Sequence, residues 1–195
     1  MQDVTVFSVG SGTQEDPYLI HDVHELQAMK NNLNAHYALA QDIDASETVN
    51  WNNGAGFEPI GSLSSRFRGS FDGRGYKIIG LHINRGSENY VGLFGVADGA
   101  TIQNVGLEDG TIVGSNYVGG IVGYLVGASS TARECYNTGS VMGEMRVGGV
   151  VGQLSSGSVT QCYNNGRVRG GTYTGGIVGY LTGTYPTVRE CYNTG

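Results

Sequence analysis

Short apolar stretches separated by glycine recur along the second half of the chain. One glycine-rich aliphatic phrase returns every 27 to 29 residues, at Tyr90–Gly95, Val118–Gly123, Val147–Gly152 and Thr174–Gly179. A second phrase keeps step with it, at Glu134–Gly139, Gln161–Gly166 and Glu190–Gly195. A fixed period of this length predicts a stack of similar units, in which each unit buries its apolar face on its neighbours.

Each period contains short strands, for which Tyr76–Ile79, Leu81–Ile83 and Thr111–Val113 are examples. Such strands are too short for a β-sandwich, and their spacing is too regular for a loop. About three strands per period, joined by glycine corners, predict an all-β fold of the parallel β-helix class, a solenoid. The glycines are expected where the backbone needs a positive φ or a close approach to its neighbour.

Stacking of the coils would turn each repeat position into a column of like residues. Hydrogen-bonded strands lie about 4.8 Å apart, so equivalent residues of successive coils should be that close. We expect three aliphatic columns to form the core: Ile112, Val141 and Val168; Ile121, Val150 and Ile177; Ala132, Val159 and Val188.

One helix is predicted before the repeats, at about residues 22–33. Asp22 suits the N-cap, and Glu25 follows three places later, as in a capping box. The apolar side of this helix would consist of Val23, Leu26, Met29 and Leu33. A short N-terminal α-helix in this place would cap the first coil and protect its strand edges from other chains.

Residues 1–195 are expected to form a single β-helix domain. Residues 1–36 would be the N-terminal cap, residues 37–89 irregular first coils, and residues 90–195 the repeats. The sequence stops at Gly195 within a repeat, so we expect the remainder of a longer chain to follow.

The amino-acid composition argues against several classes of protein. The chain has 34 Gly but only 3 Pro, which excludes collagen. No apolar run of 18 residues occurs, so no membrane insertion is expected, and residues 1–20 lack the pattern of a signal peptide. The formal net charge is −6, and no basic patch indicates binding to nucleic acid or to an anionic membrane.

The repeated phrases, together with the first half, resemble the GLUG motif repeat family. The first half contributes the segments Gly12–Thr13, Pro17–Ile20, Asp42–Asp44, Phe57–Gly61 and Phe67–Gly73. The resemblance implies a right-handed parallel β-helix of large bacterial surface or secreted proteins, among them adhesin-like proteins and the non-catalytic part of immunoglobulin A metallopeptidases. It implies no catalytic residues. The earliest repeat departs from the pattern: Val105–Leu107 stands where Glu134–Tyr136 stands later, so the Cys and Tyr columns should begin one coil late.

Three repeat positions carry side chains with possible chemistry. Cys135, Cys162 and Cys191 share one position, and parallel side chains on stacked coils disfavour a disulfide, so a column of free thiols is expected. Tyr136, Tyr163 and Tyr192 could form an exposed row that stacks on sugar rings, or a row that stacks on itself. Asn137, Asn164 and Asn193 are expected to be structural, since Asn tolerates turns and can bond the next coil.

Acidic and histidine residues of the first half complete the candidates. Asp42 and Asp44 lie two apart on a predicted strand and could act as a paired acid and base or bind calcium. No basic residue recurs beside them, so a structural role is favoured. His21 and His24 stand beside Glu25, but no His-Glu-x-x-His order is present, and neither a catalytic elbow serine nor a phosphate loop occurs.

These observations favour a non-enzymatic structural or adhesive β-helix module of a bacterial cell-surface or secreted protein. Two alternatives stay open: a polysaccharide-binding or polysaccharide-degrading β-helix, and an accessory region of a secreted metallopeptidase. No catalytic, cofactor-binding or metal-binding residue is predicted, and the ligand-binding residues are unknown. A host glycan or a surface protein is the expected partner, and the expected location is extracellular or at the cell surface.

Overall fold

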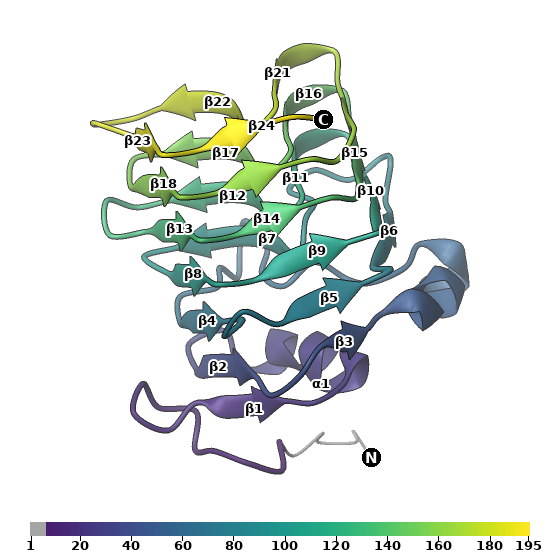
Figure 1. Ribbon diagram of the computed structural model, residues 1–195, viewed down its shortest axis with the longest axis vertical. Helices are drawn as coiled ribbons and strands as arrows, with labels where there is room; N and C mark the ends of the chain where they lie inside the picture. The colour runs from purple at the N-terminus through teal and green to yellow at the C-terminus, as the bar shows by residue number, and fades with distance from the viewer. Residues whose placement is uncertain (1–6) are drawn as a thin grey trace.

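The chain winds into a right-handed parallel β-helix, as the sequence predicts (Figure 1). The computed structural model describes residues 7–195. The N-terminal end of the solenoid lies at the bottom of Figure 1, and each coil adds one layer above it. All pairings between named strands are parallel, because each strand lies beside its equivalent in the next coil rather than beside its sequence neighbour.

Two long sheets share the front of the solenoid in Figure 1. Sheet A contains β1 (Tyr18–Ile20), β2 (His36–Leu39), β4 (Ser70–Asp72), β8 (Thr101–Gln103), β13 (Thr131–Arg133), β18 (Ser158–Thr160) and β23 (Thr187–Arg189). Sheet B contains β3 (Ile43–Asp44), β5 (Lys77–Ile79), β9 (Gly106–Glu108), β14 (Tyr136–Asn137), β19 (Tyr163–Asn164) and β24 (Tyr192–Asn193).

Three shorter sheets complete the coil. Sheet C contains β6 (His82–Asn84), β10 (Thr111–Val113), β15 (Ser140–Met142) and β20 (Val168–Arg169). Sheet E contains β11 (Asn116–Gly119), β16 (Met145–Gly148) and β21 (Thr172–Gly175). Sheet D contains β7 (Phe94–Asp98), β12 (Val122–Val126), β17 (Val151–Ser155) and β22 (Val178–Thr182).

A regular coil therefore runs through five strands, for example β8 to β12. The expectation of about three strands per period was wrong. Phrases such as Val118–Gly123 read as one strand in sequence, but the chain bends within them, so each contributes to two sheets, E and D. The bends let a short period enclose a core on all sides.

The N-terminal helix α1 (Val23–Ala28) continues as a 3₁₀ turn, η1 (Met29–Asn31), and is shorter than the expected 22–33. Asp22 is the N-cap: its Oδ1 accepts a hydrogen bond from Glu25 N at 2.8 Å. The helix ends where Asn32 leaves helical geometry, at φ −142°. Within residues 7–195, no helix is long and apolar enough to cross a membrane.

This helical segment closes the first coil, because it connects β1 and β2, two neighbouring strands of sheet A. Leu26 and Met29 are fully buried in the core. Gln27 fixes the segment from outside: its amide donates to Glu58 O at 2.9 Å and accepts from Glu58 N at 2.8 Å. The helix thus packs beneath the second coil.

The second coil is irregular between β3 and β4. The kinked 3₁₀ segment η2 (Ser46–Gly54) lies beside β6. The chain then passes along the lower edge of sheet D, where Ile60 pairs with Phe94 and Phe67 with Ala97. This segment covers the lower strand edge of sheet D, which regular strands cover in the later coils.

The three predicted core columns are confirmed. Ile112 pairs in register with Val141, and Val141 with Val168. Ala132 pairs with Val159, and Val159 with Val188, while Val150 is held by hydrogen bonds from Ile121 N and to Ile177 O. Members in the last described coil are only partly buried, and Val188 is 36% exposed, because no coil within residues 7–195 lies above it.

The core changes character along the axis. The largest fully buried side chains of the early coils are aromatic: Tyr37, Phe57, Phe67, Phe71 and Phe94. The later coils are filled by Val, Ile, Leu, Ala and Cys. The irregular first coils thus enclose bulky rings, whereas the repeated coils are packed by columns of small aliphatic side chains, as the dense packing of protein interiors requires.

The repeated glycines serve both expected purposes. Gly99, Gly127, Gly157 and Gly183 recur between sheets D and A with φ from 70° to 99°. Others permit a close approach: a Cβ on Gly149 would lie 2.2 Å from Gly176 O and 2.4 Å from Asn164 Cγ. Further left-handed residues are not glycine, for example Glu134 at φ 54° and Arg146 at φ 57°.

Candidate functional site

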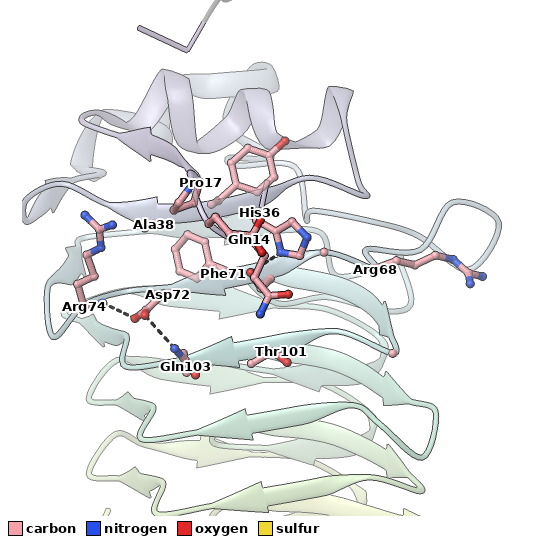
Figure 2. A pocket seen from close by; sticks show the side chains of 15 residues that line it. Gln14, Pro17, His36, Ala38, Arg68, Phe71, Asp72, Arg74, Thr101 and Gln103 are labelled. Atoms are coloured by element: carbon pink, nitrogen blue, oxygen red, sulfur yellow. Dashed lines mark hydrogen bonds between the residues drawn. The ribbon is translucent and has the colours of Figure 1, made fainter. Parts of the chain in front are cut away.

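A polar groove lies on the outer face of sheet A near the N-terminal end (Figure 2). Strands β2, β4 and β8 form its floor, and the loop before β1 forms one wall. His36 Nδ1 lies 2.8 Å from Ser70 Oγ, and the strand register places Thr101 next in the same outward column. The groove therefore combines hydroxyl, imidazole and charged groups.

The groove lacks the arrangement needed for nucleophilic catalysis. A serine activated by histidine needs a third group that orients the imidazole. Glu15 and Asp72 are the carboxylates that line the groove, and among residues 7–195 neither is hydrogen-bonded to His36. Asp72 instead accepts hydrogen bonds from Gln103 Nε2 at 2.8 Å and Asn104 Nδ2 at 3.0 Å. Arg74 N donates a third, at 2.8 Å. Burial would raise the pKa of Asp72, but these hydrogen bonds outweigh it and lower the pKa.

Asp42 and Asp44 each bind a backbone amide. Asp42 Oδ1 accepts from Lys77 N at 3.0 Å, and Asp44 Oδ1 accepts from Ser46 N at 2.9 Å. The hydrogen bonds from Ser46 lower the pKa of Asp44. Within residues 7–195, no three His, Cys, Asp or Glu side chains cluster so that they could hold a metal ion. Both aspartates therefore have a structural partner in the chain.

The two histidines of the helix have separate partners. His21 Nδ1 lies 3.2 Å from Glu25 Oε2, whereas His24 Nε2 lies 2.9 Å from Glu47 Oε1. The His24 ring also stacks on Trp51 with centroids 5.1 Å apart. The His21 contact is local to the start of the helix, whereas the His24 contacts hold the helix against the irregular second coil.

Cys135, Cys162 and Cys191 form a column of free thiols. Each thiol contacts the carbonyl of the residue two places before it and a carbonyl of the preceding coil; for Cys135 these are Arg133 O at 3.2 Å and Ile102 O at 3.7 Å. Burial raises the pKa of the Cys135 and Cys191 thiols. A buried thiol of raised pKa is a poor nucleophile, so Cys135 and Cys191 have the properties of core packing. The contact with Cys135 lowers the pKa of Cys162, but that thiol is fully buried in the core.

Tyr136, Tyr163 and Tyr192 stack on one another outside sheet B. Their ring centroids are 4.7 and 5.1 Å apart, with interplanar angles of 2° and 5°. Parallel stacking covers the ring faces that a sugar would need, so the self-stacking interpretation holds for this row. The row begins at Tyr136 because its register partner below is Gly106, where a Cβ would lie 2.0 Å from the Tyr136 ring.

That register corrects one detail of the sequence alignment. Leu107 pairs with Asn137, so the earliest repeat is aligned one residue later than expected. The Tyr column does begin one coil late, as predicted. Its lower end is fixed by charge: Tyr136 Oη donates to Glu108 at 2.8 Å, and Lys77 Nζ lies 2.9 Å from the same carboxylate. The Lys77 and Tyr136 contacts lower the pKa of Glu108.

A second aromatic surface, which the sequence analysis missed, lies on sheets D and E. We name it the tyrosine–arginine face; it comprises Tyr90, Tyr117, Tyr124, Arg146, Gln153, Tyr173 and Tyr180. Tyr90 lies in the coil below Tyr117 and stacks on it with ring centroids 4.5 Å apart. Tyr117 and Tyr124 belong to one coil and lie 5.7 Å apart between centroids; Tyr173 and Tyr180 lie two coils later, 4.7 Å apart. The signal in the sequence was a bulky residue just before each glycine-rich aliphatic phrase.

Comparisons with known proteins agree with this architecture. Residues 143–169 match the family model of the GLUG motif. The chain is 40% identical over 147 residues to halomucin of Haloquadratum walsbyi, covering 71% of this chain and 2% of the relative. It is 34% identical over 96 residues to an immunoglobulin A1 protease of Streptococcus sanguinis, covering 49% of this chain and 5% of that one.

A further relative, of Evansella cellulosilytica, is named as a Gly-rich membrane protein; it is 38% identical over 130 residues, covering 59% of this chain and 15% of the relative. The chain thus spans a small part of the relatives it matches. A solved structure from Bacteroides ovatus, titled as an immunoglobulin A1 protease, has a TM-score of 0.68 at 19% identity, covering 96% of this chain and 78% of that one. With the repeated phrases and their register, these matches show that the chain is a parallel β-helix that carries the GLUG motif.

Proposed function

We propose that this chain is a non-enzymatic β-helix module of a cell-surface or secreted protein, where it serves as a rigid, adhesive segment. The observation that carries the proposal is the arrangement of outward side chains in columns along the axis. Tyr136, Tyr163 and Tyr192 form one such column, and the tyrosine–arginine face forms another. A surface that repeats from coil to coil suits extended contact with a partner, whereas catalysis needs one unique cluster of groups.

The relatives support the same setting. Their names include a mucin-like name, a membrane protein and an immunoglobulin A1 protease. In each the matched part is a small fraction of a larger protein, which fits a module within a long extracellular chain. A host glycan or a surface protein is the partner that this role requires.

A second candidate is an accessory region of a secreted peptidase. It is favoured by the 34% identity to the Streptococcus sanguinis protease and by the fold shared with the Bacteroides ovatus structure. In that role the β-helix would position a catalytic domain near its substrate. Adhesion and positioning both need a binding surface. The two candidates therefore differ in the rest of the protein, which contains a catalytic domain only in the second.

The adhesive role is tested by coupling the purified chain to beads through one terminus and measuring their retention on mucin-coated surfaces under flow. We expect retention of the folded chain and none of the heat-unfolded chain. Periodate treatment of the mucin should abolish retention if glycans are bound, whereas protease treatment should abolish it if the polypeptide is bound. Beads that wash off all untreated surfaces would contradict the adhesive role.

The enzyme alternative is tested in parallel. The chain is incubated with a panel of polysaccharides, with and without calcium, and the products are assayed for new reducing ends and unsaturated sugars. We expect none. Turnover that Asp42→Asn or Asp44→Asn abolished would overturn the non-enzymatic proposal in favour of a polysaccharide-degrading β-helix.

A further inference from the structure

The tyrosine–arginine face holds a cation between two aromatic pairs. The guanidinium carbon of Arg146 lies 4.6 Å from the centroid of the Tyr117 ring, in the coil below, and 5.3 Å from that of Tyr180, in the coil above. Cation–π contacts of this length are favourable and hold the guanidinium in one place. Arg146 is therefore immobilised at the centre of the face.

Gln153 occupies the matching position beside this cation. The strand register aligns Gln153 with Tyr124 below and with Tyr180 above. In the coils on either side, the equivalent positions are filled by the two tyrosine pairs. Arg146 and Gln153 thus take, in the middle coil, the places that two tyrosines take in its neighbours.

Two polar atoms of this pair are buried without a hydrogen-bond partner. They are Arg146 Nε and Gln153 Oε1, and among residues 7–195 they are the unsatisfied buried side-chain nitrogen and oxygen atoms. Gln153 is only 6% exposed. A buried polar atom without a partner destabilises the fold, so such atoms are rare unless a ligand or an ordered solvent molecule completes their hydrogen bonds.

The charge of Arg146 is also unmatched within the part of the chain that the structure describes. No carboxylate among residues 7–195 lies within ion-pair distance of it. Glu144, two residues earlier, is held instead by Ser115 Oγ at 3.1 Å. The face therefore offers one fixed positive charge, one buried donor and one buried acceptor.

We propose that the tyrosine–arginine face binds an acidic glycan, a sugar chain carrying carboxylate or sulfate groups. The anionic group would accept hydrogen bonds from the Arg146 guanidinium, and a sugar hydroxyl would donate to Gln153 Oε1. The apolar C–H faces of the sugar would pack on the exposed tyrosines, of which Tyr173 is 50% exposed. This inference rests on the proposed adhesive function and names the chemistry of its ligand.

The geometry favours a glycan over a nucleic acid. Nucleic-acid surfaces neutralise several phosphates with several cations, whereas this face supplies one arginine on a chain of net charge −6. Tyr117 is stacked on Tyr90 at 4.5 Å, but Tyr173 is tilted by 47° against Tyr180 and is 50% exposed, so the Tyr173 ring keeps an open surface. A sugar needs such partly open ring faces together with a hydroxyl acceptor.

The inference is tested by calorimetric titration of the folded chain with two matched pairs of probes. Oligogalacturonate is compared with its methyl ester, and dextran sulfate with dextran. We expect binding of the charged member of at least one pair, weakening as salt rises, and none of the neutral members. The two pairs distinguish a carboxylate from a sulfate as the bound group. Binding of a single-stranded oligothymidine and of neither sugar would overturn the glycan assignment.

Variants localise the binding. Arg146→Gln should lose affinity by about tenfold or more, because a charge-assisted hydrogen bond is removed. Arg133→Gln, on sheet A, is the matched control and should bind as the unchanged chain does. If Arg146→Gln does not fold, Tyr173→Asn is used instead, since Asn tolerates the φ of 60° at that position. Equal binding by all folded variants would place the ligand elsewhere and overturn the inference.

The same variants separate this inference from the proposed function. Beads that carry Arg146→Gln should be released from mucin-coated surfaces under flow that retains the unchanged chain. Equal retention of the two proteins would support the adhesive function and would contradict binding through the tyrosine–arginine face. If neither protein is retained and neither binds a charged glycan, both proposals fall.

Discussion

Asn137 Nδ2 donates a hydrogen bond to Asn164 Oδ1 at 2.9 Å, across 27 residues of sequence. Asn164 repeats the contact with Asn193 at 2.7 Å. Asn137 and Asn164 are almost completely buried, and each also donates to a glycine carbonyl two residues later. This amide column connects successive coils through the interior.

The column predicts a large effect of removing one amide. Asn164→Ala would leave Asn137 Nδ2 and Asn193 Oδ1 without their partners in the column. We expect the free energy of unfolding to fall by about 2 to 3 kcal/mol, measured by urea denaturation. Asn165→Ala, at the exposed neighbouring position, is the matched control and should change stability by about 0.5 kcal/mol or less. Equal effects of the two substitutions would show that the column adds nothing to stability.

The aliphatic core predicts strong intolerance of charge at Val150, which is fully buried. Val150→Asp would place an unpaired carboxylate in a dry interior and should destabilise the fold by about 3 to 5 kcal/mol. Val49→Asp tests the same change at a site that is 49% exposed, and thermal melting compares the two. An unchanged melting temperature for Val150→Asp would mean that this residue faces outward.

The lowered pKa of Asp72 predicts a dependence of stability on pH. Its carboxylate is stabilised in the folded state, so its contribution is present above the unfolded pKa of about 3.9 and is lost as pH falls through the lower folded pKa. Asp72→Asn should therefore be less stable than the unchanged chain at pH 7, by about 1 kcal/mol for this partly exposed group. The difference should shrink below about pH 4.

This dependence is measured by urea denaturation from pH 7 down to pH 3. Asp109→Asn, at an exposed position, serves as the control and should leave the pH profile unchanged. A difference between Asp72→Asn and the unchanged chain that stays constant over the whole range would show that the charge of Asp72 is not what its hydrogen bonds stabilise.

The cysteine column predicts graded reactivity. Cys191 is the least buried of the three, so alkylation without reductant should label it first, and slowly, because burial raises its pKa. Cys135 and Cys162 should react only on unfolding, and mass spectrometry should then count three labels. Cys191→Ser should remove the early label alone. A native mass lower by two hydrogens, with fewer labels after unfolding, would reveal a disulfide.

Much of the fold could be predicted because the copies of a repeat adopt the same structure and stack on one another. The period fixes which residues become neighbours on successive coils, so the register of Ile112 with Val141 follows from spacing alone. The N-cap at Asp22 could be predicted because capping depends on residues three places apart. The number of strands per coil could not, since it depends on where the backbone bends. The bends occur both at glycines, such as Gly127, and at other residues, such as Glu134, so glycine alone does not mark them.

In the candidate binding face, too, the sequence determined some features and only the tertiary structure decided others. By itself the sequence determined the columns along the axis, such as Tyr163 above Tyr136, because the hydrogen-bonded stacking of coils is set by the period. Only the tertiary structure decided which columns lie side by side around the coil. Arg146 contacts Tyr180 because sheets E and D meet at a bend, and the angle of that bend comes from packing of the whole cross-section, which no spacing along the chain encodes.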